Sequence, residues 1–256
     1  MTGDERGRTV TSGPGRDRRD RAQSNVVGVA LLLGATLVAV GVLTASVGLL
    51  VDSHAARTDA DRVATDLASA VQPVETTGHH SAQVRFTEGS LATVERDLRV
   101  LKRGTTVAEV GIGGLVYERG ERRVRSVAGA VVRGRGEGAW TVDPPPVTGS
   151  EETGVLVVSA VRLNASGSSV GGGAVTATLA TNVSHERTSL GTGEFAVAVE
   201  TAAPAALETA LRERGANSVE RRDVDGDGAP SVVATFPGTR TGYLVVHDMR
   251  LVVSDG

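Results

Sequence analysis

The chain has 256 residues, with 27 basic and 30 acidic side chains and a formal net charge of −3. This near balance argues against a nucleic-acid-binding protein, and the lack of cysteine excludes disulfides, thiol catalysis and thiolate metal sites. Aromatic residues make up only 2% of the chain, so a folded core must be built mainly from Val, Leu and Ala.

Residues 1–22 are polar and rich in Gly and Arg, and they show no apolar periodicity. We therefore predict that this leader is disordered. Arginines are concentrated between residues 16 and 21, before an uncharged apolar block, whereas Asp52 and Asp59 follow the block. The positive-inside rule then predicts a cytoplasmic N-terminus, a cell-membrane location and an extracellular C-terminal region.

The apolar block, Val26–Val51, contains no charged residue and is longer than the roughly 20 residues that span a bilayer core. We predict a transmembrane or filament-core helix over residues 23–51. The helix should continue as an amphipathic extension over residues 52–72, because the apolar residues there recur on one helical face. Those residues are Ala56, Ala60, Val63, Ala64, Leu67, Ala68 and Val71. Pro73 lacks the amide for a further turn and predicts the end of the helix.

Small residues recur within the apolar block in pairs spaced by four, which allows two helix backbones to approach closely. The paired residues are Ala30 and Gly34, Gly41 and Ala45, and Thr44 and Gly48. One interpretation is packing against other helices of the same kind, in a membrane cluster or a filament core. The alternative is that glycine is simply frequent in membrane helices, and the sequence leaves both open.

Residues 74–256 contain short runs rich in Val, Leu and Thr, separated by Gly, Asn and Pro, which predict a mostly antiparallel β domain. The predicted strands cover residues 83–87, 97–101, 106–110, 114–118, 122–133, 154–162, 174–183, 194–200, 218–223, 231–235 and 243–253. The last of these is apolar on both faces and is expected to be central. Three consecutive prolines, Pro144–Pro146, cannot join a sheet and mark a possible boundary between two halves near residues 143–150.

One short helix is predicted in this domain, starting at Pro204 and ending before Gly215. Its apolar residues Leu207, Ala210 and Leu211 form one stripe, so the helix should cover a sheet. The expected fold class is therefore α+β. It combines a long N-terminal helix with a β-rich domain that carries one small helix.

Asp223, Asp225 and Asp227 alternate in a loop whose sixth residue is Gly, as in the first half of an EF-hand. Ala234 stands where an EF-hand has its bidentate Glu, and no helical pattern flanks the loop. At most a weak Ca²⁺ site is therefore expected. An ordinary Asp/Gly turn between two strands is the simpler interpretation.

Asn164 and Asn182 each begin an Asn-x-Ser tripeptide, the acceptor for N-glycosylation outside the cell. Arginines between residues 119 and 135 are interleaved with glutamates, so no polyanion site is expected. The five histidines show no pair at metal-ligand spacing with a third partner, and we find no catalytic motif. We therefore predict a protein that is not an enzyme and has no cofactor.

The segment Arg21–Val29, with the sequence RAQSNVVGV, resembles the class III signal of archaeal type IV pilins and archaellins. In that family a prepilin peptidase cuts before the apolar segment, and the helix stays on the mature subunit. The resemblance implies a cut between Ala22 and Gln23. Together with the arginine-rich, lysine-poor composition, this N-terminus is most similar to the pilin-like surface proteins of haloarchaea. Val27 stands at the fifth mature position, where bacterial pilins carry Glu.

The resemblance implies a pilin-like lollipop fold and a non-catalytic structural subunit of a cell-surface filament or membrane-held complex. The implied partners are the membrane, the prepilin peptidase and other pilin-like subunits, in a homo- or hetero-oligomer. One alternative is a single-pass membrane-anchored adhesin or binding protein that does not polymerise. A second is a secreted hydrolase whose active-site residues are scattered along the chain.

Overall fold

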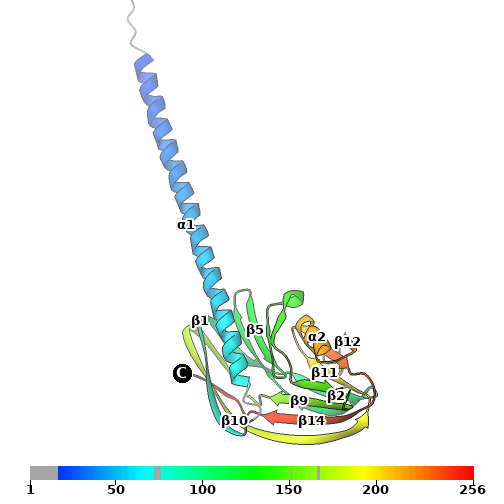
Figure 1. The fold of residues 1–256 in the computed structure, drawn as a ribbon. Helices are drawn as coiled ribbons and strands as arrows, with labels where there is room; N and C mark the ends of the chain where they lie inside the picture. The colour runs from blue at the N-terminus through cyan, green and yellow to red at the C-terminus, as the bar shows by residue number, and fades with distance from the viewer. Residues whose placement is uncertain (1–16, 72–75, 151, 166–167) are drawn as a thin grey trace, which may run out of the picture. The chain divides into compact units, whose positions relative to one another are not determined.

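The computed structural model describes residues 17–71, 76–150, 152–165 and 168–256. The chain divides into two units, Met1–Ser53 and His54–Gly256, and each is treated by itself below. The α+β expectation is confirmed: a long apolar helix is followed by a mostly β domain with one short α-helix (Figure 1).

The N-terminal helix α1 covers Asp17–Val71. The leader was predicted to be disordered up to residue 22, and this is wrong for residues 17–22, which are helical. Neither Gly nor Pro interrupts the chain between Asp17 and Gly28, so the helix extends past the predicted start. Residues 1–16 of the predicted leader, and Gln72 with Pro73, lie outside the described residues.

The described part of the second unit contains the end of α1 from His54, fifteen strands, the α-helix α2 (Pro204–Glu213) and the 3₁₀ turn η2 (Gly136–Gly138). The strands are β1 (Gly78–Val94), β2 (Asp97–Lys102), β3 (Thr105–Gly111), β4 (Gly114–Arg119), β5 (Arg122–Val127), β6 (Ala130–Arg133), β7 (Trp140–Asp143), β8 (Val147–Ser150), β9 (Val155–Arg162), β10 (Ser169–Gly193), β11 (Phe195–Glu200), β12 (Ser218–Arg222), β13 (Ser231–Thr235), β14 (Arg240–Asp248) and β15 (Val252–Asp255).

These strands form a ten-stranded sheet and a five-stranded sheet. The larger sheet has the order β7-β6-β5-β4-β1-β10-β14-β9-β8, with β15 also paired to β10, and the smaller has the order β12-β13-β11-β2-β3. Pairing is antiparallel apart from β14 and β9, which run parallel. Strand β10 is far longer than the predicted 174–183. Its first part pairs with β1 and its second part with β14.

Two predicted strands are each divided in the structure. Residues 122–133 form β5 and β6, joined at Ala128 and Gly129, which both have positive φ, as a tight hairpin turn requires. The predicted strand 243–253 forms β14 and β15, with Arg250 at φ 44° in the connection. The expected central position holds for β14, which lies between β10 and β9.

Two large clusters of buried side chains stabilise the unit. One joins the buried face of α1, including Ala60, Val63 and Leu67, to side chains of the ten-stranded sheet. The other contains residues from both sheets and from α2. Both clusters draw on residues before and after Pro144–Pro146, so this run joins strands of one unit instead of separating two halves.

Candidate functional site

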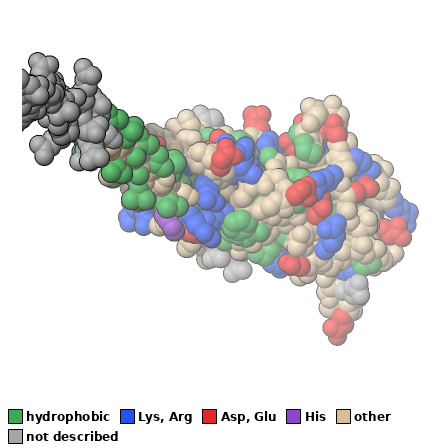
Figure 2. Space-filling view, turned by 90° about the horizontal axis from the view of Figure 1, so that it is seen from above, with side chains coloured by type: hydrophobic (Ala, Val, Ile, Leu, Met, Phe, Trp, Pro, Cys, Tyr) green, Lys and Arg blue, Asp and Glu red, His purple; other side chains and the backbone are tan. Residues whose placement is uncertain are grey.

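The apolar part of α1 is exposed along its whole length. Residues 27–54 are all solvent-accessible, and within the described part of the chain α1 is the helix long and apolar enough to cross a membrane. Apolar side chains dominate this segment in the space-filling view (Figure 2). A core helix of a water-soluble domain would bury such a surface. The segment therefore suits a membrane anchor or a signal sequence.

The hydroxyl groups in this segment are satisfied by the helix itself. Thr36 donates to the carbonyl of Leu32 at 2.7 Å, and Thr44 donates to the carbonyl of Val40 at 2.9 Å. Ser46 bonds in the same way four residues back. Polar side chains that find a partner within their own helix can enter a bilayer at little cost, so these residues do not interrupt the apolar segment.

The glycines of the segment leave room for a close neighbour. Gly34, Gly41 and Gly48 are seven residues apart, a spacing that keeps them on nearly one face of a helix. A Cβ atom added at any of them would meet nothing within 4 Å in this chain. Ala30, Thr44 and Ala45 complete the predicted set of small residues on α1. The unfilled space is available to another helix.

The buried end of α1 carries a polar contact to the sheet. The Asp59 carboxylate accepts from the backbone N–H of Thr87 at 3.1 Å and from its hydroxyl at 2.5 Å, and Arg119 lies 2.6 Å away. Tyr117 donates to the carbonyl of Glu88 at 2.8 Å. Burial, with a further contribution from the Asp59 charge, raises the pKa of Tyr117 to about 12.

Two further aspartates of α1 contact the same sheet. Asp61 pairs with Arg133, which also donates to the carbonyl of Arg57, and Asp66 accepts from the backbone N–H of Arg85 at 3.2 Å. Asp59, which the sequence offered as a marker of topology, therefore holds the helix to the β-sheet together with Asp61 and Asp66. Their spacing along α1 gives no sign of this role, because the partners come from β1, β4 and β6.

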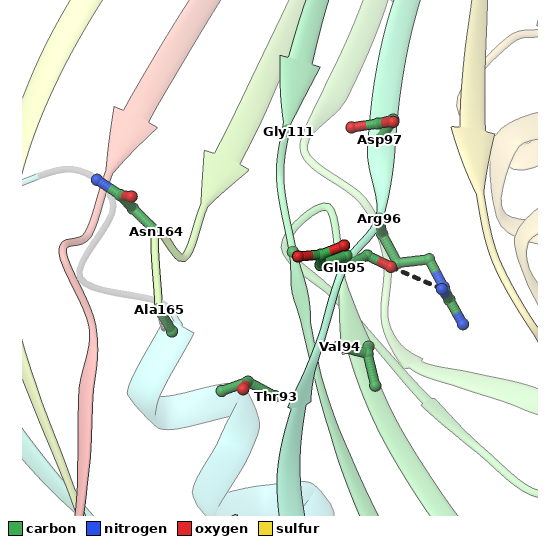
Figure 3. A pocket seen from close by; sticks show the side chains of 9 residues that line it. Thr93, Val94, Glu95, Arg96, Asp97, Gly111, Asn164 and Ala165 are labelled. Atoms are coloured by element: carbon green, nitrogen blue, oxygen red, sulfur yellow. Dashed lines mark hydrogen bonds between the residues drawn. The ribbon is translucent and has the colours of Figure 1, made fainter. Parts of the chain in front are cut away.

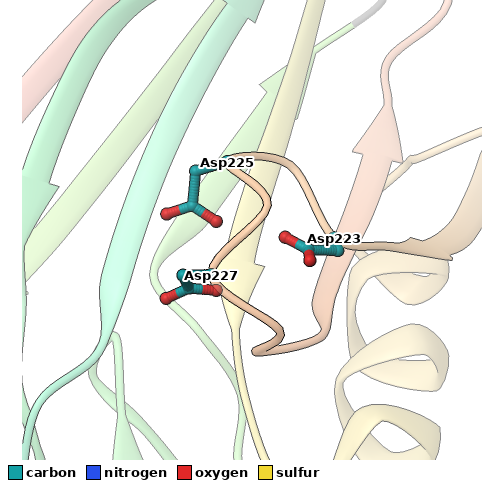
Figure 4. Close-up of side chains that lie close together, drawn as sticks. All are labelled: Asp223, Asp225 and Asp227. Atoms are coloured by element: carbon teal, nitrogen blue, oxygen red, sulfur yellow. The ribbon is translucent and has the colours of Figure 1, made fainter.

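The predicted cation-binding loop has its three carboxylates together. Asp223 lies across the loop from Asp225 and Asp227, and one oxygen of each lies within 4.8 Å of the others (Figure 4). Both Asp223 oxygens already accept backbone N–H groups, from Gly226 at 2.7 Å and Gly228 at 3.0 Å. This bonding is typical of an Asp/Gly turn, the simpler of the two interpretations.

A buried arginine neutralises part of this loop. The Arg99 side chain, on β2, pairs with Asp225 and lies 3.0 Å from Asp97 and 3.2 Å from Glu109. Burial by itself would lower the pKa of Arg99, but the three carboxylates outweigh that effect and raise it. Asp225 therefore has a permanent cation beside it, with which a metal ion must compete.

An open cavity of about 410 Å³ lies near the predicted glycosylation site Asn164. Its lining is mostly polar and includes Glu95, Asp97, Gly111 and Asn164. Figure 3 shows the two carboxylates directed toward the side on which Asn164 lies. Behind it, Glu200 accepts from the backbone N–H of Asp97 at 3.1 Å, and burial raises the pKa of Glu200. The cavity suits a small polar group.

The second predicted glycosylation residue, Asn182, lies inside β10, paired with β1. Its backbone N–H donates to the carbonyl of Met249 at 2.8 Å, and the neighbouring Asp248 accepts from the Asn164 side chain at 3.3 Å. The peptide bond between Ala22 and Gln23 falls within α1. The arginine cluster is largely paired with acids, as its interleaved glutamates suggested: Arg123 lies 2.5 Å from Glu118.

One histidine pair was missed in the sequence. His185 and His247 are 62 residues apart, yet they face each other across β10 and β14. No local spacing reveals a contact that depends on strand register.

Neither a curated protein nor a solved structure matches this chain. One family model does match, over residues 21–252, which includes most of α1 and nearly all of the β unit. The chain therefore belongs to DUF7289, a family of unknown function.

Proposed function

We propose that this protein is a pilin-like, non-catalytic structural subunit of a cell-surface filament or membrane-held complex. The observation that carries the proposal is the apolar segment of α1, which is exposed along residues 27–54 among the described residues. Such a surface requires lipid or other apolar helices around it. The extracellular position of the β unit follows from the charge asymmetry around the segment.

Packing of α1 against other helices is compatible with two surroundings of the apolar segment, a bilayer and a filament core. In a bilayer the segment is surrounded by lipid, and in a filament it is surrounded by the same segment of neighbouring subunits. Because lipid tails are as apolar as Leu, association must come from close packing. The spaces beside Gly34, Gly41 and Gly48 permit that packing.

Processing would fall between Ala22 and Gln23, where α1 is already helical. A peptidase generally acts on an extended backbone, so the first turns of α1 would have to unwind at the enzyme. Helix ends fray readily, which makes this local opening inexpensive. N-terminal sequencing of the mature protein tests this step directly: a chain that begins at Gln23 supports it, and one that retains residues before Gln23 contradicts it.

Assembly is tested by filling the glycine spaces. In the double substitution Gly41→Leu and Gly48→Leu, the new side chains enter open space in the subunit, so the β unit should fold normally. We expect fewer surface filaments by electron microscopy and fewer cross-linked oligomers in membranes. The matched control is Gly28→Leu, which also meets nothing within 4 Å but lies about 120° around the helix from Gly34. Equal assembly in the double variant and the control would refute packing through these glycines.

A membrane-anchored binding protein that does not polymerise is the second candidate. The polar cavity beside Glu95 and Asn164 favours it, since a purely structural subunit has no need for one. This candidate predicts a monomer in native membranes whose apolar segment tolerates the Gly41→Leu and Gly48→Leu changes. The oligomeric state of the wild type therefore separates the two functions.

A further inference from the structure

Two of the five histidines of the chain meet on the exposed side of the large sheet. His185 on β10 is directly opposite His247 on β14 in the strand register. Their Nδ1 atoms are 2.9 Å apart, and the rings are nearly perpendicular, at 79°. His185 is exposed and His247 is half-buried.

The separation of the two nitrogens matches a particular coordination geometry. At a metal–nitrogen distance of about 2.0–2.1 Å, two ligands at a right angle to each other lie about 2.9 Å apart, whereas tetrahedral ligands lie about 3.3 Å apart. Right-angled nitrogen ligands are typical of Cu²⁺ and Ni²⁺ in square-planar or tetragonal sites, and Cu²⁺ binds most tightly in the divalent series. The geometry points to a Cu²⁺ site formed by the Nδ1 atoms of His185 and His247.

The acidic residues next in sequence to the two histidines are not placed to act as further ligands. Glu186 and Asp248 each neighbour one of the histidines in sequence, so strand alternation directs their side chains to the opposite face. Asp248 is also engaged by Arg162, at 2.7 Å. Arg187 lies on the same face as His185, with its guanidinium carbon 4.2 Å from the centre of the Tyr243 ring. Its positive charge opposes a bound cation, and it limits the affinity of the site.

A bound ion would link β10 to β14 beyond their backbone hydrogen bonds. Both histidines must be neutral to act as ligands, so protons compete with the metal ion for the two nitrogens. The rival explanation for the short distance is a shared proton, with one ring donating its N–H to the other. A metal site predicts that the histidine pair binds one Cu²⁺, whereas a shared proton alone predicts no binding.

The test is a Cu²⁺ titration of the full chain in detergent at about pH 7.5, one unit above the ordinary histidine pKa. Calorimetry gives the stoichiometry, and electron paramagnetic resonance gives the number of coordinating nitrogens. We expect one ion per chain with two imidazole nitrogens, and a rise in melting temperature. His185→Asn and His247→Asn should each abolish the two-nitrogen spectrum and the rise in melting temperature.

The control is the double substitution His79→Asn and His80→Asn, which removes an adjacent histidine pair from β1 and should leave the signal unchanged. Circular dichroism establishes that each variant is folded. A two-nitrogen signal that survives in His185→Asn, or that disappears in the control, would overturn the assignment. So would a folded wild type that takes up no Cu²⁺, a result that leaves the shared proton as the explanation. None of these outcomes depends on filament assembly.

Discussion

The Asp59 carboxylate on α1 lies 2.6 Å from the Arg119 guanidinium on β4, and the two side chains are only 3% and 9% exposed. This pair fixes the helix on the sheet at one register. An apolar stripe alone permits a helix to slide along a sheet, whereas a buried ion pair with the Thr87 hydrogen bonds has one favourable position.

Replacing Asp59 by Ala should destabilise the β unit strongly. Removal of one partner of a buried pair leaves the other charge in a poorly solvated position, and the expected loss is about 3–5 kcal/mol. Urea unfolding of the detergent-solubilised chain measures it. The matched control is Glu121→Ala, at the exposed Glu121–Arg135 pair, where a loss below about 1 kcal/mol is expected. Similar losses in both variants would show that burial of the pair is unimportant.

Alkaline pH should destabilise the β unit through Tyr117, whose hydroxyl donates to the carbonyl of Glu88. The folded-state pKa of about 12 exceeds the ordinary value of 10.0, so the folded state holds the proton more tightly than the unfolded state. Stability from this group is complete below about pH 10 and falls as the pH rises toward 12, by on the order of 2 kcal/mol. In Tyr117→Phe this pH dependence should disappear. If the free energy of unfolding of the variant fell as steeply between pH 10 and 12 as that of the wild type, the pH dependence would come from other groups.

Gly89→Ala should destabilise strand β1. Gly89 has φ 123°, and a Cβ atom there would lie 2.6 Å from the carbonyl oxygen of Glu118 on β4. The backbone conformation and the steric contact both oppose a side chain, so we expect a loss of more than about 1 kcal/mol in thermal or urea unfolding. Gly138→Ala is the control, because a Cβ there meets nothing within 4 Å and its φ is not positive. An effect confined to Gly138 would contradict this reasoning.

Calcium should bind the Asp223–Gly228 loop only weakly, at millimolar concentration, because Arg99 already neutralises Asp225. In Arg99→Met this competing cation is gone, and a lower calcium concentration should suffice. Amide signals of Gly226 and Gly228, followed by NMR during titration, report on the loop. Saturation of the wild type at micromolar calcium would contradict the expectation, as would identical titrations of the two proteins.

Glycosylation should favour Asn164 over Asn182. Asn164 lies between β9 and β10 at φ 48°, outside regular structure, whereas Asn182 lies within β10 with its backbone N–H bonded to Met249. Acceptor sites in loops are the more accessible to modification. The native protein should lose glycan mass in Asn164→Gln and keep it in Asn182→Gln. The reverse pattern of intact masses would show that modification precedes the pairing of β10.

Local patterns were sufficient to predict the helices. The apolar run and the recurrence from Ala56 to Val71 identified α1, because helical periodicity depends only on near neighbours in sequence. Pro204 and Gly215 likewise identified α2, with Pro at its first turn and Gly215 at φ 94° just after it. The start of α1 was missed because polar residues 17–22 show no apolar periodicity, although they permit a helix.

Contacts between strands that are distant in sequence could not be predicted from the sequence. The length of β10 was underestimated because Gly171, Gly172 and Gly173 look like a break, while in the structure they pair with β1. The Asp59–Arg119 and His185–His247 contacts both depend on strand order and register, which a single sequence does not specify. The members of the acidic loop are close in sequence, and those carboxylates do lie together.

The pairing of β10 also constrains when the β unit can form during synthesis. Its neighbours on one side, β14 and β15, are made well after β10, and Ala177 is opposite Asp255. A ribosome-bound chain that lacks these strands leaves an unpaired edge along the middle of the larger sheet. This part of the larger sheet can therefore be completed only after β14 and β15 have been made, and a chaperone or the export machinery has that interval in which to engage the chain.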